Sequence, residues 1–380
     1  MQHAKSADPE LKDMNFENIR ERFSIARTAG KRAKEAAESI GVSEGEAVAA
    51  HCGEHAYPPK ARLLHGPWVE LLQSLELCGP LLALTRNEST VHEKTGVYKK
   101  ISAQGHMGLA LGEDIDLRMF LDKWHAGFAV TELAANPQNR PNTSLQFFDT
   151  HGKAIHKIFP REATDIEAWE MSIGAFCLPP SQAERSPVTF TPAPAKPAIP
   201  SDESRDATAM LAAWTQMKDT HEFFGLLRDH EVERQQSFRL AEGKYTRALA
   251  KHAIKDLLME ASFDGTPIMC FVSSPACIQI HTGPVKRIEP IDIRGVQWLN
   301  VIDPNFNLHL REDSIEHVWA VEKPTSDGIV TSVEAFDAHG DLMVMFFGAR
   351  KPGQVEKPAW QAIVANLNSS SVPESVNENA

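Results

Sequence analysis

One stretch of this chain occurs twice, and the repetition constrains the fold more than any other feature. TSLQFFDTHGKAIHKIF, from Thr143, aligns with TSVEAFDAHGDLMVMFF, from Thr331, at Thr-Ser, an aromatic, Asp, His-Gly and the final Phe. Further pairs keep the same order at a shift of about 190 residues, well beyond the period of solenoid repeats. These pairs are the runs from Ile115 and Phe306, LLQSLELCGP with LLMEASFDGT, and Ala168-Trp169 with Ala359-Trp360. We therefore predict a tandem duplication of one domain.

Each half begins with helix-forming residues and then changes to short alternating runs. NIRERFSIARTAGKRAKEAAESIGVSEGEAVAAH is rich in Ala, Glu, Arg and Lys, and a Gly-Val-Ser-Glu-Gly break divides it into two helices. From about Leu81, and again in IMCFVSS and ACIQIHTG, apolar residues alternate as in strands. DTHGK and DAHGD place a glycine where a hairpin turn needs positive φ. The order predicts an α+β fold, in which each domain has a large antiparallel β-sheet and attached helices.

A proline-rich segment divides the chain near its middle. LPPSQAERSPVTFTPAPAKPAIPSDESRD cannot sustain a helix or bury a core, so it should run extended as a semi-rigid spacer. We predict five parts: a disordered tail (1–20), an N-terminal repeat (21–177), the linker (178–207), a C-terminal repeat (208–367) and a second disordered tail (368–380).

Charge and cysteine usage narrow the class of protein. The net charge is −12, which disfavours nucleic acids and anionic membranes as partners and requires local Lys or Arg for any anionic ligand. The five cysteines form no CxxC pair, so neither a zinc knuckle nor a disulfide framework is indicated. The N-terminus lacks an apolar signal region, and no apolar run reaches transmembrane length. We expect a reduced, cytoplasmic protein without membrane insertion.

Common enzyme motifs are absent. There is no HExxH, no GxxxxGK[ST], and no GxGxxG after a strand. GVSEG fits the letters of a nucleophile elbow, but a helix precedes it; Ser43 is predicted to cap the next helix, with Glu46 completing a capping box. The residues alone therefore indicate a duplicated α+β binding protein.

WTQMKDTHEFFGLLRDH, residues 214–230, carries a histidine on an apolar stripe. Read as one helix, it places Trp214, Met217, His221 and Phe224 on one face. One interpretation is a core histidine that donates to a backbone carbonyl. The other is a ligand that points from a helix into an apolar slot, and this segment alone leaves both open.

Several long motifs together resemble one family. NLHLREDSIEHVWAVEKPTSDGIVTSVEAFDAHGDLMVMFFGARKPGQ, IQIHTGPVKRI, KDTHEFFGLLRDHEVERQQ and GEDIDLRMFLDKWHAGFAVTE are similar to the cytoplasmic hemin-degrading and haem-trafficking proteins of bacterial haem-uptake systems. The resemblance runs from roughly Phe23 to Leu367, apart from the linker. It implies two similar halves and haem, iron protoporphyrin IX, held in a cleft of the second half. The first half has no counterpart of His221, so one haem per chain is expected.

The resemblance also implies roles for individual residues. His221 matches the axial iron ligand, and Arg118 the arginine on the opposite side of the haem, a catalytic residue where the protein degrades haem. On spacing alone, Arg118 would be a surface arginine on a strand whose Leu117, Met119 and Leu121 face inward. Phe120 shares the face of Arg118 and is expected to flank the ring. The remaining positions have plain alternatives, a solvated charge or core packing: Arg234, Lys323 and Arg350 for the propionates, and Phe271 and Phe347 for the wall.

Two other histidines stand near these motifs. His230 lies near the expected helix end, where the helix dipole favours it, and its alternative role is a ligand used while haem is passed on. His281, in IQIHTG at a strand end, is another possible ligand and is interpreted as structural or peripheral.

Three functions follow as alternatives. The first is a haem-binding protein that accepts imported haem and either delivers it to a haem oxygenase or degrades it to release iron, with an external reductase. The second is a carrier without turnover, and the third a structural or regulatory module that binds no haem. The partners implied are haem, a haem oxygenase and a haem-import ATPase complex, for a monomer or homodimer.

Overall fold

The computed structural model describes residues 15–132, 141–179, 187–293, 295–351 and 353–369. It divides into two compact units. Unit 1 comprises Met1–Arg86, Glu93–Pro194 and Ser274–Gln279, and unit 2 comprises Asn87–His92, Ala195–Ser273 and Ile280–Ala380. The strands β3 (Thr90–Gly96) and β12 (Cys277–Gly283) are each divided between the units, so the boundary is more than one cut in the linker.

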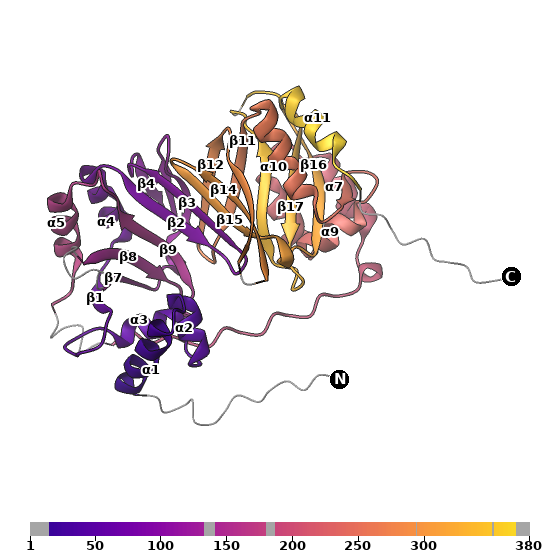
Figure 1. Ribbon diagram of the computed structural model, residues 1–380. Helices are drawn as coiled ribbons and strands as arrows, with labels where there is room; N and C mark the ends of the chain where they lie inside the picture. The colour runs from indigo at the N-terminus through magenta and orange to yellow at the C-terminus, as the bar shows by residue number, and fades with distance from the viewer. Residues whose placement is uncertain (1–14, 133–140, 180–186, 294, 352, 370–380) are drawn as a thin grey trace. The chain divides into compact units, whose positions relative to one another are not determined.

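Unit 1 combines short helices with antiparallel strands (Figure 1). Five of its strands pair in the order β1-β7-β8-β9-β2, and β4, β5 and β6 form a meander. The helices are α1 (Phe16–Thr28), α2 (Ala33–Ser39), α3 (Glu44–Ala50), α4 (Trp68–Ser74) and α5 (Ile166–Phe176). The strands are β1 (Lys60–Leu64), β2 (Leu81–Arg86), β4 (Ile101–Gln104), β5 (Met107–Leu111), β6 (Asp116–Phe120), β7 (Ala126–Glu132), β8 (Asn142–Phe148) and β9 (Ala154–Pro160).

Unit 2 repeats this plan. Its strands pair in the order β10-β16-β17-β18-β11, and β13, β14 and β15 form the second meander. The helices are α7 (Ala207–Thr215), α8 (Glu222–Asp229), α9 (Arg234–Leu240), α10 (Ala253–Asp264) and α11 (Pro358–Asn366). The strands are β10 (Thr246–Leu249), β11 (Ile268–Ser273), β13 (Ile288–Ile293), β14 (Val296–Asp303), β15 (Phe306–Arg311), β16 (His317–Thr325), β17 (Gly328–Phe336) and β18 (Leu342–Gly348).

The repeated sequence forms the same hairpin in both units. Gly152, between β8 and β9, has a φ of 72°, and Gly340, between β17 and β18, has a φ of 76°. Both hairpins carry a register shift next to an inward aromatic, at Phe147/Phe148 and at Ala335/Phe336. The prediction of a duplicated α+β fold is therefore confirmed.

The capping prediction for the first half is also confirmed. Ser43 Oγ accepts from the backbone N–H of Glu46 at 3.2 Å, and the Glu46 carboxylate accepts from the N–H of Ser43 at 2.7 Å. Ser43 therefore caps α3 and is not a nucleophile on an elbow after a strand.

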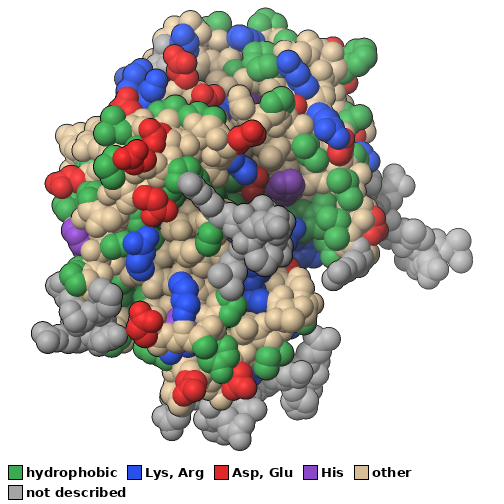
Figure 2. All heavy atoms as spheres, turned by 60° about the vertical axis from the view of Figure 1, so that its left-hand side comes forward, with side chains coloured by type: hydrophobic (Ala, Val, Ile, Leu, Met, Phe, Trp, Pro, Cys, Tyr) green, Lys and Arg blue, Asp and Glu red, His purple; other side chains and the backbone are tan. Residues whose placement is uncertain are grey.

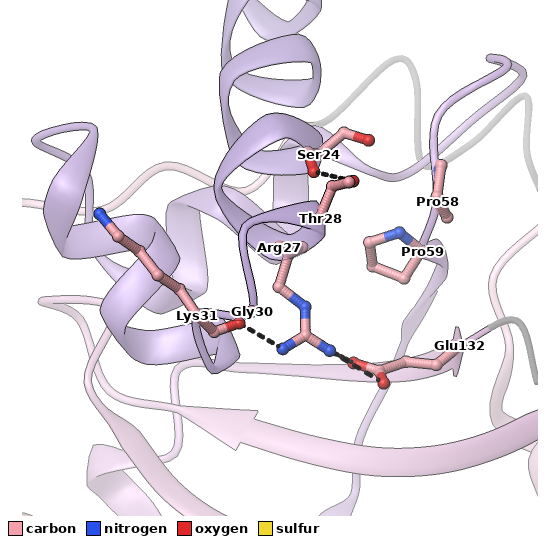
Figure 3. Close-up of a pocket in the computed structure, with 8 residues that line it drawn as sticks. All are labelled: Ser24, Arg27, Thr28, Gly30, Lys31, Pro58, Pro59 and Glu132. Atoms are coloured by element: carbon pink, nitrogen blue, oxygen red, sulfur yellow. Dashed lines mark hydrogen bonds and ion pairs between the residues drawn. The ribbon is translucent and has the colours of Figure 1, made fainter. Parts of the chain in front are cut away.

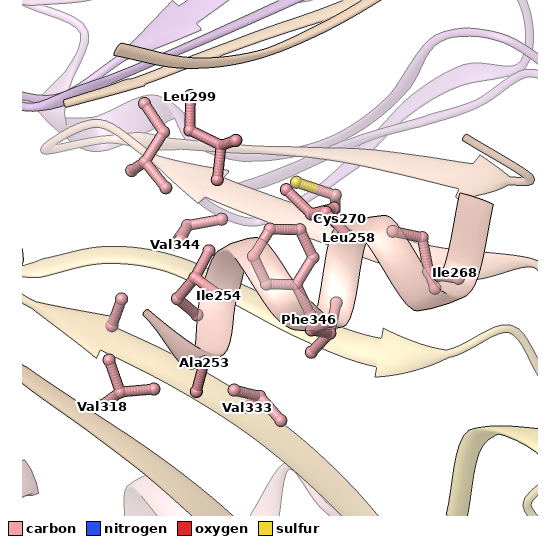
Figure 4. Close-up of a cluster of buried hydrophobic side chains, with 14 of the residues drawn as sticks. Ala253, Ile254, Leu258, Ile268, Cys270, Leu299, Val318, Val333, Val344 and Phe346 are labelled. Carbon is pink, nitrogen blue, oxygen red and sulfur yellow. The ribbon is translucent and has the colours of Figure 1, made fainter. Parts of the chain in front are cut away.

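One face of the unit 2 sheet forms an apolar core beneath α10 and α11. Alternate strand residues such as Val318, Val333 and Phe346 point to this face and pack against Ile254 and Leu258 of α10 (Figure 4). The other residues of the same strands point to the opposite face. That second face is the one that carries most of the predicted haem-site residues.

Replacement of Gly348 by alanine is expected to destabilise unit 2 by about 1–3 kcal/mol, because an added methyl overpacks the core. A Cβ at this position would lie 2.6 Å from Trp360 Cγ, and Trp360 is fully buried. Urea unfolding measures the loss. Gly174→Ala is the matched control: this helical glycine has no atom within 4 Å of the new Cβ, so stability should hold or rise. Equal stability of both variants would contradict the packing at Gly348.

The segment 214–230 is not one helix, which corrects the sequence prediction. α7 ends at Thr215 and α8 begins at Glu222, with His221 as its N-cap residue. Asp219 stabilises the start of the second helix, because its side chain accepts the backbone N–H of His221 at 2.8 Å. Trp214 and Met217 are buried, whereas Phe224 is 60% exposed, so the four residues share no stripe.

Residues 187–201 of the predicted linker form no helix or strand, but a 3-10 helix (Asp202–Ser204) and the first residue of α7 lie within its predicted bounds, and the linker is not a free spacer. In unit 1, Thr191 N donates to Thr150 O at 2.8 Å, and Thr189 O accepts from His125 Nε2 at 2.9 Å. In unit 2, Gln236 Nε2 donates to Pro200 O at 2.7 Å. Both described parts of the linker are therefore docked, and residues 180–186 lie outside the described residues.

The bounds predicted for the two disordered tails differ from the bounds of the folded structure. α1 starts at Phe16, inside the segment predicted to be disordered, while residues 1–14 lie outside the described residues. At the other end, Asn368 O accepts from Ala250 N at 2.9 Å, so the fold extends past Leu367. Residues 370–380 again lie outside the described residues.

The described residues include no helix with the length and apolarity to span a bilayer. Figure 2 shows acidic and basic side chains interspersed with apolar ones over the face in view.

Candidate functional site

His221 offers an exposed imidazole that is held on one side. Its side chain is 89% exposed, and Nδ1 donates to Asp219 Oδ1 at 2.6 Å. The pKa of Asp219 is lowered, first by the backbone N–H of His221 and also by the imidazole and the charge of Arg350. An ionised carboxylate only accepts, so the proton stays on Nδ1 and the lone pair of Nε2 is available to a metal. This arrangement fits a single axial iron ligand.

The loop that carries His221 is tied to the rest of unit 2. Lys218 O accepts from Ser326 N at 2.9 Å, in the turn between β16 and β17. In the same turn, Asp327 Oδ2 lies 3.4 Å from Arg350 Nη1, and the Arg350 side chain is mostly buried. Arg350 therefore lies on the same side of the unit as the Asp219–His221 pair, as the sequence prediction requires.

Two further predicted cations share one buried carboxylate. Arg234 donates to Glu334 through Nε at 2.8 Å and Nη2 at 2.9 Å, and Lys323 Nζ donates to Glu334 Oε1 at 3.1 Å. Neither cation is a solvated surface charge, because both side chains are largely or wholly buried. One carboxylate facing two cations leaves one positive charge for an anion.

Aromatic rings lie beside these cations. Lys323 Nζ is 5.0 Å from the centroid of Phe223 and 5.7 Å from that of Phe347, and Arg234 lies 5.3 Å from Phe223. Phe347 in turn packs edge-on against Phe271, with centroids 5.1 Å apart. Phe271 and Phe347 are partly exposed, so they are not core residues and can line an apolar slot.

Arg118 and Phe120 belong to unit 1. On β6, Leu117 and Met119 are fully buried, whereas Arg118 and Phe120 alternate with them and are partly exposed, although Phe120 still packs against the core of unit 1. This alternation confirms the predicted inward face for Leu117 and Met119, whereas Leu121 follows the strand in a short 3-10 turn and is only partly buried. The Arg118 guanidinium forms an ion pair with Asp116 and donates to Leu117 O at 3.2 Å. The role of both residues towards haem stays a prediction.

The other candidates have structural roles. His230 is the C-cap residue of α8, as the dipole argument predicted. His281 is buried and stacks on Phe306 with centroids 3.8 Å apart, which agrees with a structural interpretation. Within the described residues, no group of three His, Cys, Asp or Glu side chains is placed to hold a metal ion.

Among the described residues, a cavity in unit 1 contains no cluster of cations and aromatic rings like the one described above. This cavity, of about 510 Å³, has a single bidentate ion pair, since Arg27 donates to both oxygens of Glu132 at 3.1 and 3.2 Å (Figure 3). Arg27 also donates to Lys31 O at 2.9 Å, so its guanidinium is satisfied within the protein. The residues lining this cavity are Ser24, Arg27, Thr28, Gly30, Lys31, Pro58, Pro59 and Glu132.

Sequence reasoning missed Asp219, Glu334 and Ser332. Ser332 Oγ donates to Glu334 Oε1 at 2.8 Å and accepts from Lys323 Nζ at 2.9 Å, so it belongs to the same polar cluster. The available signal was the alternation in TSVEAFD, which places Ser332, Glu334 and Phe336 on one face of a buried strand. A charged residue in such a row needs a buried partner.

Each unit is expected to lose stability in acid, because one buried carboxylate in each becomes protonated. Burial alone would raise the pKa of Glu334 and of Glu44, but their cations outweigh it and lower each pKa from 4.5 to about 2. A folded pKa below the unfolded one gives stability that is complete above pH 4.5 and lost as pH falls towards about 2. The loss is on the order of 3 kcal/mol per group.

Urea unfolding between about pH 6 and pH 3 measures this loss. Lys323 is fully protonated in both states over this range and adds no slope. The Glu334→Gln protein should lose the part of this acid dependence that comes from Glu334. An unchanged slope of stability against pH would contradict the lowered pKa of Glu334.

Comparisons with known proteins place the chain among haem proteins. A family profile described as the haemin-degrading HemS.ChuX domain matches residues 41–176 and 231–367, one match in each repeat. Hemin transport protein HmuS of Yersinia pestis is 35% identical, over 90% of this chain and 94% of that protein. Hemin transport protein HemS of Yersinia enterocolitica is also 35% identical, over 91% and 96%.

Solved structures of haem proteins are also similar to this chain. The crystal structure of holo-PhuS, a heme-binding protein from Pseudomonas aeruginosa, has a TM-score of 0.86 at 40% identity and covers 94% of this chain and 100% of that chain. That of ChuS, an E. coli heme oxygenase, has a TM-score of 0.79 at 32% identity, over 92% and 99%. His221 precedes the second profile match, so its assignment rests on the geometry and on the DTHEFF motif.

Proposed function

Because the chain belongs to the haemin-degrading HemS.ChuX family, we propose that it binds one haem, with His221 as the axial iron ligand. The observation that carries the proposal is the exposed imidazole whose Nδ1 is fixed by Asp219, which leaves Nε2 for the iron. In solved metal sites, a histidine ligand usually donates its other nitrogen to such an acceptor.

The neighbouring residues match the rest of the ligand. Haem has an apolar ring and two carboxylates, and Phe271 and Phe347 supply apolar wall on the face where Arg234 and Lys323 lie. Arg350 adds a cation close to the loop of His221. An acidic chain thus provides local positive charge for the propionates, as its net charge requires.

The role of the bound haem has two versions, delivery and degradation. Relatives are described as hemin transport proteins in one case and as a heme oxygenase in another. In the degradative version, haem would supply the oxygen chemistry, Arg118 would donate hydrogen bonds to its ligand, and electrons would come from an external reductase. In the delivery version, a haem oxygenase receives the haem. For either version we propose a cytoplasmic location and supply by a haem-import ATPase.

Product analysis separates the two versions. The hemin complex is incubated with a physiological reductant, with catalase present to remove peroxide, because free peroxide bleaches exposed haem without an enzyme. Biliverdin-like pigment and free iron would establish degradation, and Arg118→Ala should then slow it. An intact hemin spectrum over the same period would indicate a carrier that does not degrade haem. A protein that never shifts the Soret band would refute haem binding itself.

A further inference from the structure

Glu334 is the common partner of four polar contacts in unit 2. This fully buried carboxylate accepts twice from Arg234, at 2.8 and 2.9 Å, and once each from Lys323 at 3.1 Å and Ser332 at 2.8 Å. It has no solvent contact of its own and no exposed edge that a ligand could touch. Whatever it contributes to binding must therefore pass through the two cations.

The strand register places this carboxylate beside the aromatic wall. Ser332 pairs with Phe347 and Glu334 with Met345 between β17 and β18, and Met345 pairs with Phe271 on β11. Partners in register point to the same face of a sheet. Glu334 thus lies in the same face as Phe271 and Phe347.

Unit 1 shows that the fold does not require a carboxylate here. In the aligned motifs TSLQ and TSVE, Gln146 occupies the position of Glu334. Unit 1 has its own buried cluster, in which Glu44 contacts Lys157 at 2.6 Å and Arg86 at 2.5 Å. There the carboxylate is the first residue of α3, the place that Arg234 takes in α9. The arrangement in unit 2 is the reverse: the arginine lies on the helix and the carboxylate lies on the sheet.

We propose that Glu334 is a positioning residue for haem binding: it keeps Lys323 charged and Arg234 fixed, so that the pair presents one net positive charge to a haem propionate. This inference rests on the proposed function and extends it to a residue that touches no haem itself.

The electrostatics of Lys323 support this role. Its neighbours are Glu334 and Ser332 on β17, Arg234 on α9, and the rings of Phe223 and Phe347. Burial lowers the pKa of Lys323 to about 8, the charge of Arg234 lowers it as well, and Glu334 opposes both. Without the carboxylate, only the Ser332 hydroxyl and the faces of Phe223 and Phe347 would favour the charged lysine, so the pKa of Lys323 would fall further.

The test follows hemin affinity against pH in the full-length protein, from about pH 6 to pH 9.5, for the parent and Glu334→Gln. In the parent, affinity should fall as pH rises through the titration of Lys323. In the variant, the midpoint of this fall should move down by about one pH unit. Ser332→Ala is the matched control, because it removes a neutral hydroxyl from the same cluster but keeps the charge of Glu334, so its midpoint should move less than that of Glu334→Gln.

Two further samples isolate the charge effect. Lys323→Met should abolish the fall of hemin affinity with rising pH, both in the parent and in Glu334→Gln. Any pH dependence that remains then belongs to the titration of hemin itself. Hemin dimethyl ester carries no propionate charge, so its affinity should be the same for parent and Glu334→Gln. A Glu334→Gln protein with the parent's midpoint for hemin binding would overturn the inference while leaving haem binding by His221 intact. A parent that binds no hemin would overturn both.

Folding of the variant is checked by circular dichroism. Gln146 in the other repeat indicates that glutamine is tolerated at this position. Should Glu334→Gln fail to fold, Glu334→Asp serves instead, because it keeps the charge but withdraws it by one methylene. Its midpoint should lie below that of the parent by less than one unit, and a midpoint equal to the parent's would overturn the inference.

Discussion

Hemin is expected to bind the His221→Ala protein at least about tenfold more weakly than the parent, with a displaced Soret band. The variant loses the nitrogen that would bind the iron, while Arg234, Lys323 and the aromatic wall remain for the propionates and ring. Residual binding should therefore resemble that of hemin in an apolar slot without a strong axial ligand. Titration followed by absorbance measures both the affinity and the band position.

Matched variants separate the ligand from its surroundings. Asp219→Asn should weaken binding less than His221→Ala does, because the imidazole remains but its orientation and basicity change. His230→Ala should bind hemin like the parent, since His230 caps α8. If His230 serves as a transfer ligand, the His221→Ala protein keeps a shifted band that the double variant loses. An unchanged spectrum and affinity in His221→Ala would remove the assignment.

The second large effect concerns stability. Phe346→Ala is expected to destabilise unit 2 by about 3–5 kcal/mol, because a fully buried ring is lost from beneath α10 and leaves a cavity. Amide hydrogen exchange of residues 253–264 and 342–348 should rise with the loss in urea resistance, which locates the effect in this core.

Phe263→Ala is the control for this substitution. Phe263 also lies in unit 2, on α10, but is 87% exposed, so the same chemical change should alter stability by less than about 0.5 kcal/mol. Similar losses in the two variants would mean that Phe346 does not occupy the core described above.

The repeat made the fold predictable. Two aligned hairpins, each with an Asp-x-His-Gly turn, require the same local structure, and Gly152 and Gly340 indeed adopt the same positive φ. Alternation along IDLRMFL likewise gave the correct face for Arg118. Both features depend on contacts within a hairpin or strand, which a short sequence specifies by itself.

Features that depend on side-chain hydrogen bonds were not predictable in this way. Periodicity joined α7 and α8 into one helix, because it scores apolar spacing and ignores the Asp219 side chain that stabilises the start of the second helix. As a result, the histidine was placed on a buried stripe, although it is exposed at an N-cap. Its role as a ligand came from the family resemblance, and the spacing argument for it was wrong.

The buried carboxylate illustrates the same limit. Glu334 and Arg234 are 100 residues apart in sequence. No local pattern pairs them, and their contact depends on how α9 packs on the sheet. The linker is similar, since its proline content predicted the lack of helix but not the docking of Thr191 on the turn at Thr150.

Hemin titration of the unmodified full-length protein, followed at the Soret band, tests the central claim most directly. The account predicts one saturable step that ends at one hemin per chain, with the spectrum of a histidine-bound haem that His221→Ala does not reproduce. A featureless titration without a Soret shift, or two equal hemins per chain with spectra independent of His221, would contradict it.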